Sequence, residues 1–219
     1  MAGKPPLTVD ILMSEARAFA EWESQHQEPL LYWITDGKAV GTYLEQKFRT
    51  HLQARYAFVA GNSATGIDLP ELGIDFKTTS IRQPQSSCPF QSARQKIYGL
   101  GYSLLIFVYD KRDDPVATTA NLQIRHVIYV DKKRTGDYQT TTGLLRILDN
   151  DGNEDDILAF LSERMLPVDD IQAQELAQQI LRNPTQTGYL TISNALQWRL
   201  QYTRVIGKAG EVEGIIRVL

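Results

Sequence analysis

The 219-residue chain is expected to adopt an α/β fold, with a central mixed sheet flanked by helices and a small helical module at its C-terminal end. Two observations predict this. Residues 36–130 read as helix, strand, helix and strand in an order typical of a mixed sheet covered by helices. After the polar run at residues 149–156, the pattern changes to helices and one short closing strand. We therefore expect a core at residues 1–150 and a helical module at residues 151–219.

The individual elements follow from the spacing of apolar residues. Near the N-terminus these residues recur every three or four positions, which predicts helices at residues 9–25 and 36–53. Short runs rich in β-forming residues predict strands at residues 56–60, 73–80, 104–110 and 123–130, with a helix at residues 90–100. In the module, helices are expected at residues 155–165, 169–182 and 191–206, and a strand at residues 214–219.

Composition excludes several classes of protein. The longest apolar run, at residues 102–109, is far shorter than the roughly 20 residues that span a bilayer. Cys88 is the single cysteine, so no disulfide framework is expected. For the same reason we expect a cytoplasmic location. A net charge of −3 excludes a uniformly basic nucleic-acid coat but allows a local basic groove. Because there is no glycine-rich phosphate loop, no nucleotide cofactor is expected.

The most specific chemistry lies in one short segment, GIDLPELGIDFKTTS at residues 66–80. If its PELG stretch forms a hairpin turn, Leu69 pairs with Ile74. Asp68 then stands across from Asp75 on the same face. Like charges that face each other across strands, with Cβ atoms roughly 5 Å apart, are destabilising unless a cation lies between them. A divalent cation, which prefers oxygen ligands, would turn the two carboxylates into a binding site.

Lys77 shares a face of the same strand with Asp75, because side chains alternate along a strand. An ammonium group is therefore expected beside the cation site. Upstream, Glu45 borders the apolar stripe of the second helix, from where it could reach the same site. These residues suit hydrolysis of a phosphodiester. A metal ion lowers the pKa of a bound water, while the lysine orients or deprotonates that water and offsets negative charge.

At these residues the chain resembles the PD-(D/E)XK nuclease superfamily, which has the restriction-endonuclease-like fold, and it is most like a type II restriction endonuclease. The resemblance rests on Asp68, then the Asp75-Phe76-Lys77 element, with Glu45 on a preceding helix and a helix and an apolar strand following. It implies Mg²⁺ as cofactor, with Asp68, Asp75, Glu45 and the Phe76 backbone as metal ligands. It also implies that Asp68, Asp75, Lys77 and Glu45 are catalytic.

Other interpretations of these residues stay open. Ile67 stands where the family motif has proline. The Asp-Phe-Lys element could lie on an ordinary exposed strand face, with the first acid as a turn residue. Glu45 could instead pair with Arg49 one helical turn away. Glu71 is the nearest alternative carboxylate if the hairpin register slips by one residue.

Two regions are candidates for contact with DNA. By the same resemblance, Gln95 on the helix at residues 90–100 is expected to point toward the active site or the phosphates. In the helix at residues 191–206 and just beyond it, amide and cationic side chains form one polar stripe, which suits a major groove. The stripe consists of Asn194, Gln197, Gln201, Arg204 and Lys208. Three helices with a closing strand also resemble a winged-helix DNA reader. DNA readout and dimer packing both stay open for this module.

Together these expectations describe a Mg²⁺-dependent endodeoxyribonuclease that hydrolyses phosphodiester bonds of double-stranded DNA. A type II restriction endonuclease is the first choice, because the chain is compact and carries no ATPase motif. A homodimer is expected, since cutting both strands favours two symmetric sites. The alternatives are a repair or recombination nuclease acting on branched or single-stranded DNA, and a non-catalytic DNA-binding module on the nuclease fold. No membrane association is expected.

Overall fold

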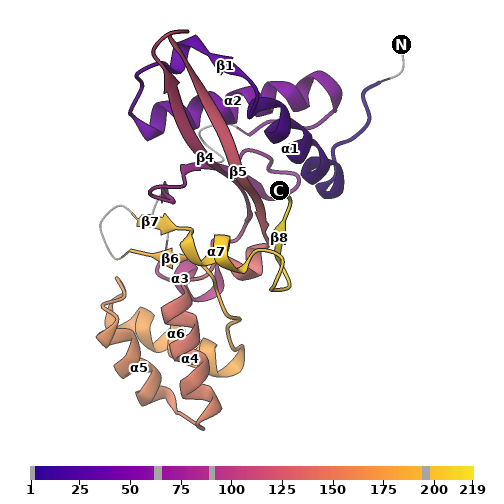
Figure 1. Cartoon of the computed structure of the whole chain (residues 1–219). Helices are drawn as coiled ribbons and strands as arrows, with labels where there is room; N and C mark the ends of the chain where they lie inside the picture. The colour runs from indigo at the N-terminus through magenta and orange to yellow at the C-terminus, as the bar shows by residue number, and fades with distance from the viewer. Residues whose placement is uncertain (1–2, 62–65, 89–91, 194–197) are drawn as a thin grey trace. The chain divides into compact units, whose positions relative to one another are not determined.

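The structure, a computed structural model, describes residues 3–61, 66–88, 92–193 and 198–219. The chain divides into two units, whose elements are labelled in Figure 1. Unit 1 comprises residues 1–85, 103–130 and 208–219, and unit 2 comprises residues 86–102 and 131–207. No helix within the described ranges is long and apolar enough to cross a membrane.

Both N-terminal helices begin at a polar cap and bury one apolar stripe in unit 1. α1 (Val9–Glu23) follows Thr8 and α2 (Gly37–Arg55) follows Asp36, and each capping side chain accepts a backbone N–H of the first turn. Their buried residues repeat at the spacing of one helix face. The main ones are Leu12, Ala16, Phe19 and Ala20 in α1, and Val40, Leu44, Phe48 and Leu52 in α2. The two helices predicted from the sequence are confirmed.

A five-stranded mixed sheet completes unit 1. Its strand order is β1-β5-β4-β2, and β8 also pairs with β5. β2 runs parallel to β4, whereas the other pairs are antiparallel. The strands are β1 (Gln27–Glu28), β2 (Ile74–Ser80), β4 (Ser103–Asp114), β5 (Thr119–Val130) and β8 (Ile215–Arg217). This mixed sheet with its flanking helices confirms the predicted fold class.

Aromatic side chains fix α2 to the sheet of unit 1. The ring centroid of Phe48 lies 5.0 Å from that of Phe19 in α1 and 5.2 Å from that of Phe76 in β2. It also lies 5.0 Å from the ring centroid of Phe107 in β4. All four side chains are buried. Truncating a buried phenylalanine costs about 3–5 kcal/mol, so this cluster holds α2 firmly against β2.

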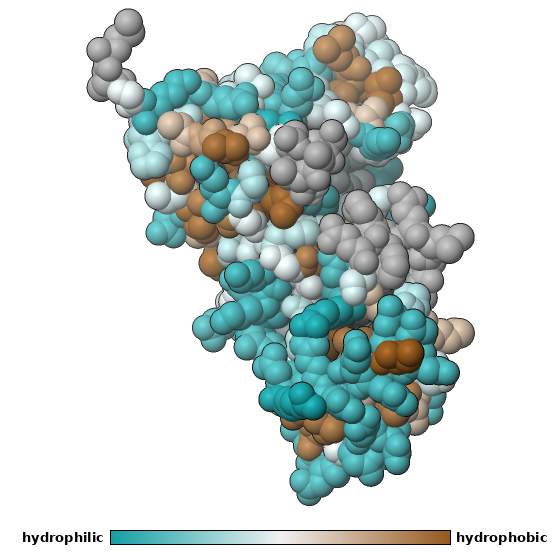
Figure 2. Space-filling view, turned by 180° about the vertical axis from the view of Figure 1, so that it is seen from behind, coloured by the Kyte–Doolittle hydropathy of each residue, from teal (hydrophilic) through white to brown (hydrophobic). Residues whose placement is uncertain are grey.

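Unit 2 is mainly helical and carries a second, three-stranded sheet of order β3-β7-β6. Its helices α4 to α6 share a small apolar core that includes Leu144, Ile157, Leu161 and Ile180. Mostly hydrophilic side chains cover the face of these helices that Figure 2 shows. The remaining elements of the chain are β3 (Gln85–Cys88), α3 (Arg94–Tyr98), α4 (Tyr138–Asp149), α5 (Glu154–Glu163), α6 (Asp170–Arg182), β6 (Thr191–Ile192), β7 (Trp198–Gln201), α7 (Thr203–Lys208), and the 3-10 helices η1 (Pro29–Leu31) and η2 (Lys132–Arg134).

The prediction of one helix at residues 191–206 is wrong. The structure has β6, then residues 194–197 outside its described ranges, then β7 and the short helix α7. β6 and β7 are antiparallel, and Thr191 pairs with Gln201 and Ile192 with Leu200. Strand pairing overrides the helical spacing here because it buries both Ile192 and Leu200. The polar stripe predicted for this segment therefore does not lie on one helix.

The winged-helix expectation for the C-terminal module is also corrected. A closing strand does form, but this strand, β8, pairs with β5 in the sheet of unit 1. A wing would have to belong to the helical module itself. Elsewhere, the predicted strand at residues 56–60 is wrong, since only Ala57 forms an isolated bridge, with Pro6. Helix α4 was not predicted at all.

The two units also divide the chain at places other than residue 150. Leu144 of α4 packs with Ile157 and Leu161 of α5, so the polar run at residues 149–156 connects two helices of the same unit. Residues 208–219 belong to unit 1. The change in composition near residue 150 marks a polar turn, but it gives no information about how the flanking helices pack. The domain boundary expected at residue 150 therefore differs from the boundaries of the two units.

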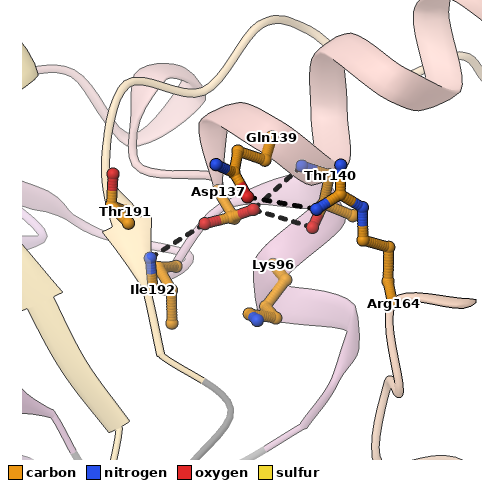
Figure 3. A pocket seen from close by; sticks show the side chains of 7 residues that line it. All are labelled: Lys96, Asp137, Gln139, Thr140, Arg164, Thr191 and Ile192. Carbon is orange, nitrogen blue, oxygen red and sulfur yellow. Dashed lines mark hydrogen bonds between the residues drawn. The ribbon is translucent and has the colours of Figure 1, made fainter.

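Asp137 joins α4 to β6 within unit 2 (Figure 3). Its side chain is 4% exposed and accepts the backbone N–H groups of Thr140 and Ile192, each at 2.8 Å. It also accepts the Thr140 hydroxyl at 2.7 Å. A polar cavity of about 130 Å³ lies beside it, lined by Lys96, Asp137, Gln139, Thr140, Arg164, Thr191 and Ile192. Asp137 thus caps a helix and orders a strand with one buried carboxylate.

The substitution Asp137→Ala is expected to lower the free energy of unfolding by about 3 kcal/mol, because it leaves three buried donors without their acceptor. Asp149→Ala, at the exposed end of the same helix, is the control and should change stability by less than about 0.5 kcal/mol. Urea unfolding followed by circular dichroism measures both. Equal losses in the two variants would contradict the structural role of Asp137.

Candidate active site

The hairpin turn predicted at PELG is present in unit 1. Leu69 and Ile74 form an antiparallel bridge, with backbone N–H···O distances of 2.9 and 3.2 Å. Gly73 closes the turn with φ at +62°, a backbone conformation that favours glycine. This register places Asp68 opposite Asp75, as the sequence predicts. The alternative register, with Glu71 as the acid, does not form; the Glu71 carboxylate instead accepts the Val59 N–H at 3.3 Å.

Asp68 is held by two donors. Its Oδ2 accepts the backbone N–H of Phe76 at 2.8 Å, and its Oδ1 forms an ion pair with the Arg49 guanidinium of α2. The side chain is 14% exposed. Since the N–H and C=O of one residue point to the same side of a strand, the Phe76 carbonyl also faces the side on which Asp68 lies.

Asp75 and Lys77 lie on one face of β2, as the period-two alternation predicts. Lys77 Nζ is 2.6 Å from Asp75 Oδ2, and the two side chains are 19% and 7% exposed. Burial raises the pKa of the Asp75 carboxyl, and the neighbouring Asp68 raises it further, while the Lys77 ammonium acts in the opposite direction. The ionised form of Asp75 is therefore unfavourable in this environment, and added positive charge would stabilise it.

Glu45 shares this electrostatic environment from α2. Burial raises the pKa of its carboxyl to about 7. The charges of Asp68 and Asp75 also raise it, whereas Lys77 lowers it. Glu45 therefore lies near the two acids of the hairpin. Arg49 forms its ion pair with Asp68, so the alternative of a Glu45–Arg49 surface pair does not describe this helix face.

The donor set suits a hard divalent cation. Three carboxylates and the Phe76 carbonyl supply oxygen atoms only, which Mg²⁺ and related ions prefer. The raised pKa values of Glu45 and Asp75 mark a place where a cation is favourable. Within the described ranges, however, no three acidic, histidine or cysteine side chains converge as a ready-made metal cluster. The cations of Arg49 and Lys77 instead hold the two aspartates.

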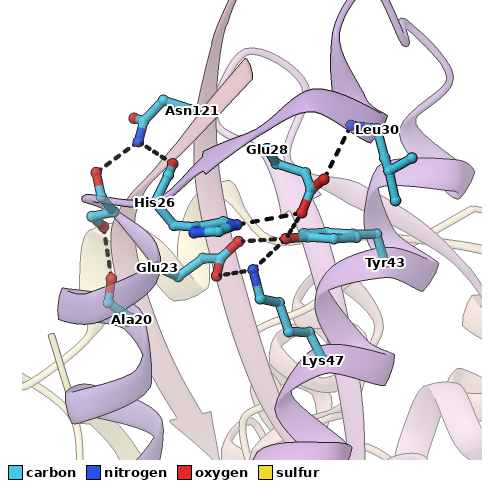
Figure 4. A network of polar contacts seen from close by, with 9 residues as sticks. Ala20, Glu23, His26, Glu28, Leu30, Tyr43, Lys47 and Asn121 are labelled. Carbon is cyan, nitrogen blue, oxygen red and sulfur yellow. Dashed lines mark hydrogen bonds and ion pairs between the residues drawn. The ribbon is translucent and has the colours of Figure 1, made fainter. Parts of the chain in front are cut away.

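A second polar cluster holds the opposite face of α2 (Figure 4). Lys47 Nζ lies 2.9 Å from Glu23 Oε2 of α1, and the Tyr43 hydroxyl donates to Glu28 Oε2 of β1 at 2.8 Å. Tyr43 and Lys47 are one helical turn apart and share a face, while Glu45 lies midway between them in sequence and faces the other side. Helix α2 is thus fixed to α1 and β1 on one face and presents Glu45 on the other.

One residue expected to contact DNA, Gln95, lies in unit 2 with almost no exposed surface. Gln95 of α3 is 8% exposed, and its Nε2 donates to the Leu100 carbonyl at 3.2 Å. A contact between Gln95 and DNA would require this bond to break. Asn194 and Gln197 lie outside the described residues.

The other members of the predicted stripe are split between β7 and α7. Gln201 is exposed on β7. Arg204 of α7 donates to the Thr191 hydroxyl at 3.2 Å and lies over the Tyr138 ring, with its Cζ 3.8 Å from the centroid. Lys208 is exposed at the end of α7. Gln201 and Lys208 therefore keep surface positions, whereas Arg204 is partly engaged inside unit 2.

The fold and these residues define the class of the protein. A mixed sheet flanked by helices, with an Asp-x-Lys element on the strand at one end and an acid facing it across a turn, is the restriction-endonuclease-like arrangement.

Comparison with known proteins identifies the family. A family model described as type II restriction enzyme NspV matches residues 6–217 of this chain. The type II restriction enzyme NspV of Nostoc sp. (strain ATCC 29411 / PCC 7524) is 63% identical over 212 residues, which make up 97% of this chain and 96% of that relative. No solved structure matches the chain. The chain belongs to the NspV family of type II restriction enzymes.

Family membership confirms the predicted activity class. The protein is a type II restriction endonuclease, an enzyme that acts on DNA and hydrolyses its phosphodiester bonds. Enzymes of this class generally use divalent metal ions. One feature of the site was missed by sequence reasoning, namely the pairing of Arg49 with Asp68. The sequence did offer an indication of this pairing. Arg49 follows Glu45 by one helical turn, so a helix that places Glu45 beside the aspartates also places Arg49 there.

The stability of the metal-free protein is expected to fall as the pH rises from about 4.5 to about 7. Glu45 titrates near 7 in the folded state against 4.5 for its ordinary value, so in this range the folded chain holds a proton that the unfolded chain has released. Its contribution amounts to at most about 3 kcal/mol. Urea unfolding in EDTA across this range measures the slope.

In the same experiment Glu45→Gln should reduce the slope, because glutamine does not titrate, and the slope that remains below about pH 6 comes from Asp75, whose pKa is raised to about 6. Gln46→Glu, which places a carboxylate on the exposed side of the same helix, should leave it unchanged. A slope that is the same in Glu45→Gln as in the wild-type protein would contradict the burial of a titrating Glu45.

Proposed function

We propose that the protein cuts double-stranded DNA in a Mg²⁺-dependent reaction, with Asp68, Asp75 and Glu45 as metal ligands and Lys77 as the catalytic lysine. The observation that carries this proposal is the placement of Asp68, Asp75 and Lys77 at the β2 hairpin, with Glu45 of α2 within their electrostatic influence, in a member of a restriction enzyme family. The Phe76 carbonyl is the fourth oxygen that we assign to the metal.

Each of the assigned site residues has a separate task in this proposal. Bound Mg²⁺ supplies Lewis acidity and lowers the pKa of a water molecule. Lys77, as an ammonium, would orient the attacking water by donating to it, and its charge would stabilise the negative phosphoryl oxygens. Asp75 holds the Lys77 ammonium on the reacting side of β2 through their 2.6 Å contact. Glu45, whose pKa lies near 7, accepts the cation more readily as it loses its proton.

We further propose that the enzyme acts as a homodimer in the cytoplasm. Two symmetric sites would allow both strands of a duplex to be cut within one complex. A restriction function requires access to DNA inside the cell, which is consistent with this location. Gln95, Asn194, Gln197, Gln201, Arg204 and Lys208 remain our candidates for DNA contact. For the segment around α7, DNA readout and dimer packing are both compatible with an exposed Gln201 and Lys208.

Lys77→Ala and Asp75→Asn should each reduce Mg²⁺-dependent plasmid cleavage by at least about 1,000-fold, because each removes a group that acts on the reacting phosphate or its metal. DNA binding, measured by gel shift in Ca²⁺, and the circular dichroism spectrum should be retained. Lys38→Ala, an exposed lysine on α2, is the control and should cut at the wild-type rate. Wild-type cleavage by Lys77→Ala would refute the site.

A large DNA of known sequence, incubated with the protein and Mg²⁺ but without ATP, should yield discrete fragments. The fragments reflect cutting at a fixed recognition sequence, and no nucleotide should be needed because the sequence carries no phosphate loop. A smear of products would indicate nonspecific digestion and would argue against restriction. A strict requirement for ATP would overturn the proposal that the enzyme needs no nucleotide.

A further inference from the structure

Arg49 forms an ion pair with Asp68 Oδ1, an oxygen atom that the proposed metal ion would also bind. Its guanidinium contacts Asp68 Oδ1, while Asp68 Oδ2 is already bound by the Phe76 N–H. A cation that binds Asp68 through Oδ1 must therefore displace Arg49. Arginine cannot lose its proton in a protein, so a displaced guanidinium stays charged and needs another anion.

The charge balance of the site explains why an arginine is there. Glu45, Asp68 and Asp75 carry three negative charges when ionised, and Lys77 supplies one positive charge. Arg49 brings the sum from −2 to −1, which reduces the repulsion between the carboxylates. A divalent ion would add two positive charges to the site. The carboxylates would then be neutralised without Arg49, and its positive charge would be in excess.

The contacts of Arg49 leave it able to change partner. About a third of its side chain is exposed, at 33%, against 14% for Asp68. Its buried Nε has no hydrogen-bond partner among the residues that the structure describes. A buried donor without an acceptor is unfavourable, so the present arrangement does not satisfy the whole guanidinium. A planar guanidinium binds phosphate oxygens through two parallel N–H groups, which would use more of its donors.

We infer that Arg49 exchanges Asp68 for a phosphate oxygen of the DNA when a divalent metal ion and DNA bind. Before binding, it neutralises Asp68 and keeps the carboxylates together. After binding, it holds the strand that is cut and adds positive charge beside the reacting phosphate. This inference rests on the proposed role of Asp68 as a metal ligand.

The first test measures metal binding without DNA. Titration calorimetry with Mn²⁺ should give about 10-fold tighter binding to Arg49→Ala than to the wild-type protein, because the competing cation is gone. In EDTA the Tm of the variant should be lower, and Mn²⁺ should raise it by more than it raises that of the wild type. Arg55→Ala, an exposed arginine on the same helix, is the control and should match the wild type in both measurements. Equal or weaker Mn²⁺ binding by Arg49→Ala would overturn the competition for Asp68.

The second test measures single-turnover cleavage in Mg²⁺. Arg49→Ala should cut about 100-fold more slowly than Arg55→Ala, despite its tighter metal binding, because the contact to phosphate is lost. Arg49→Lys keeps the charge and serves if the alanine variant does not fold. It should bind Mn²⁺ like the wild type but cut about 10-fold more slowly, since lysine cannot form the paired contact. Wild-type cleavage by Arg49→Lys would overturn the role of the guanidinium.

The failure of this inference can be told apart from the failure of the proposed site. If Lys77→Ala still cuts DNA, the site assignment fails. If Lys77→Ala is inactive and Arg49→Ala matches Arg55→Ala in Mn²⁺ affinity and cleavage, only the exchange of Arg49 is wrong.

Discussion

Burial raises the pKa values of Glu45 and Asp75 at β2, the neighbouring carboxylates raise them further, and the rest of unit 1 has to hold these acids in place. The turn that ends at Gly73 holds Asp68 opposite Asp75, and the buried Phe48 cluster holds α2 and therefore Glu45 against the same strand. Because the packing is apolar and extensive, it can keep acids together that would otherwise separate. The site is thus prepared for positive charge before any ligand arrives.

Helix α2 has a different task on each of its faces. On one side, Tyr43 and Lys47 bind the buried Glu23 and the partly buried Glu28, and a buried acid of this kind is costly to leave unpaired. On the other side, Glu45 and Arg49 face the hairpin. The first set of contacts sets the position and rotation of the helix, and the second set acts on the metal and on DNA in our proposal. A substitution of Lys47 would therefore alter the position or rotation of α2, and with it the positions of Glu45 and Arg49.

The hairpin could be predicted from the sequence because two local rules agree there. Alternation along β2 fixes which side chains share a face, and the PELG turn fixes the register, so Asp68, Asp75 and Lys77 lie as expected. The partner of Arg49 could not be predicted, since helical spacing gives the face of a residue but not the acid across from it. The segment at residues 191–206 failed for a related reason. Its spacing fits a helix, but antiparallel pairing of Ile192 with Leu200 across the segment decides its structure.

The path of the chain between the units has a consequence for protein engineering. β2 and β4 are parallel neighbours, and the connection between them runs through unit 2, which the chain enters a second time after β5. Unit 2 is therefore built from two separate stretches of sequence, 86–102 and 131–207. A chimaera that borrows this unit from a related enzyme must replace both stretches together, with splice points at four places. A single crossover would combine halves of two different cores.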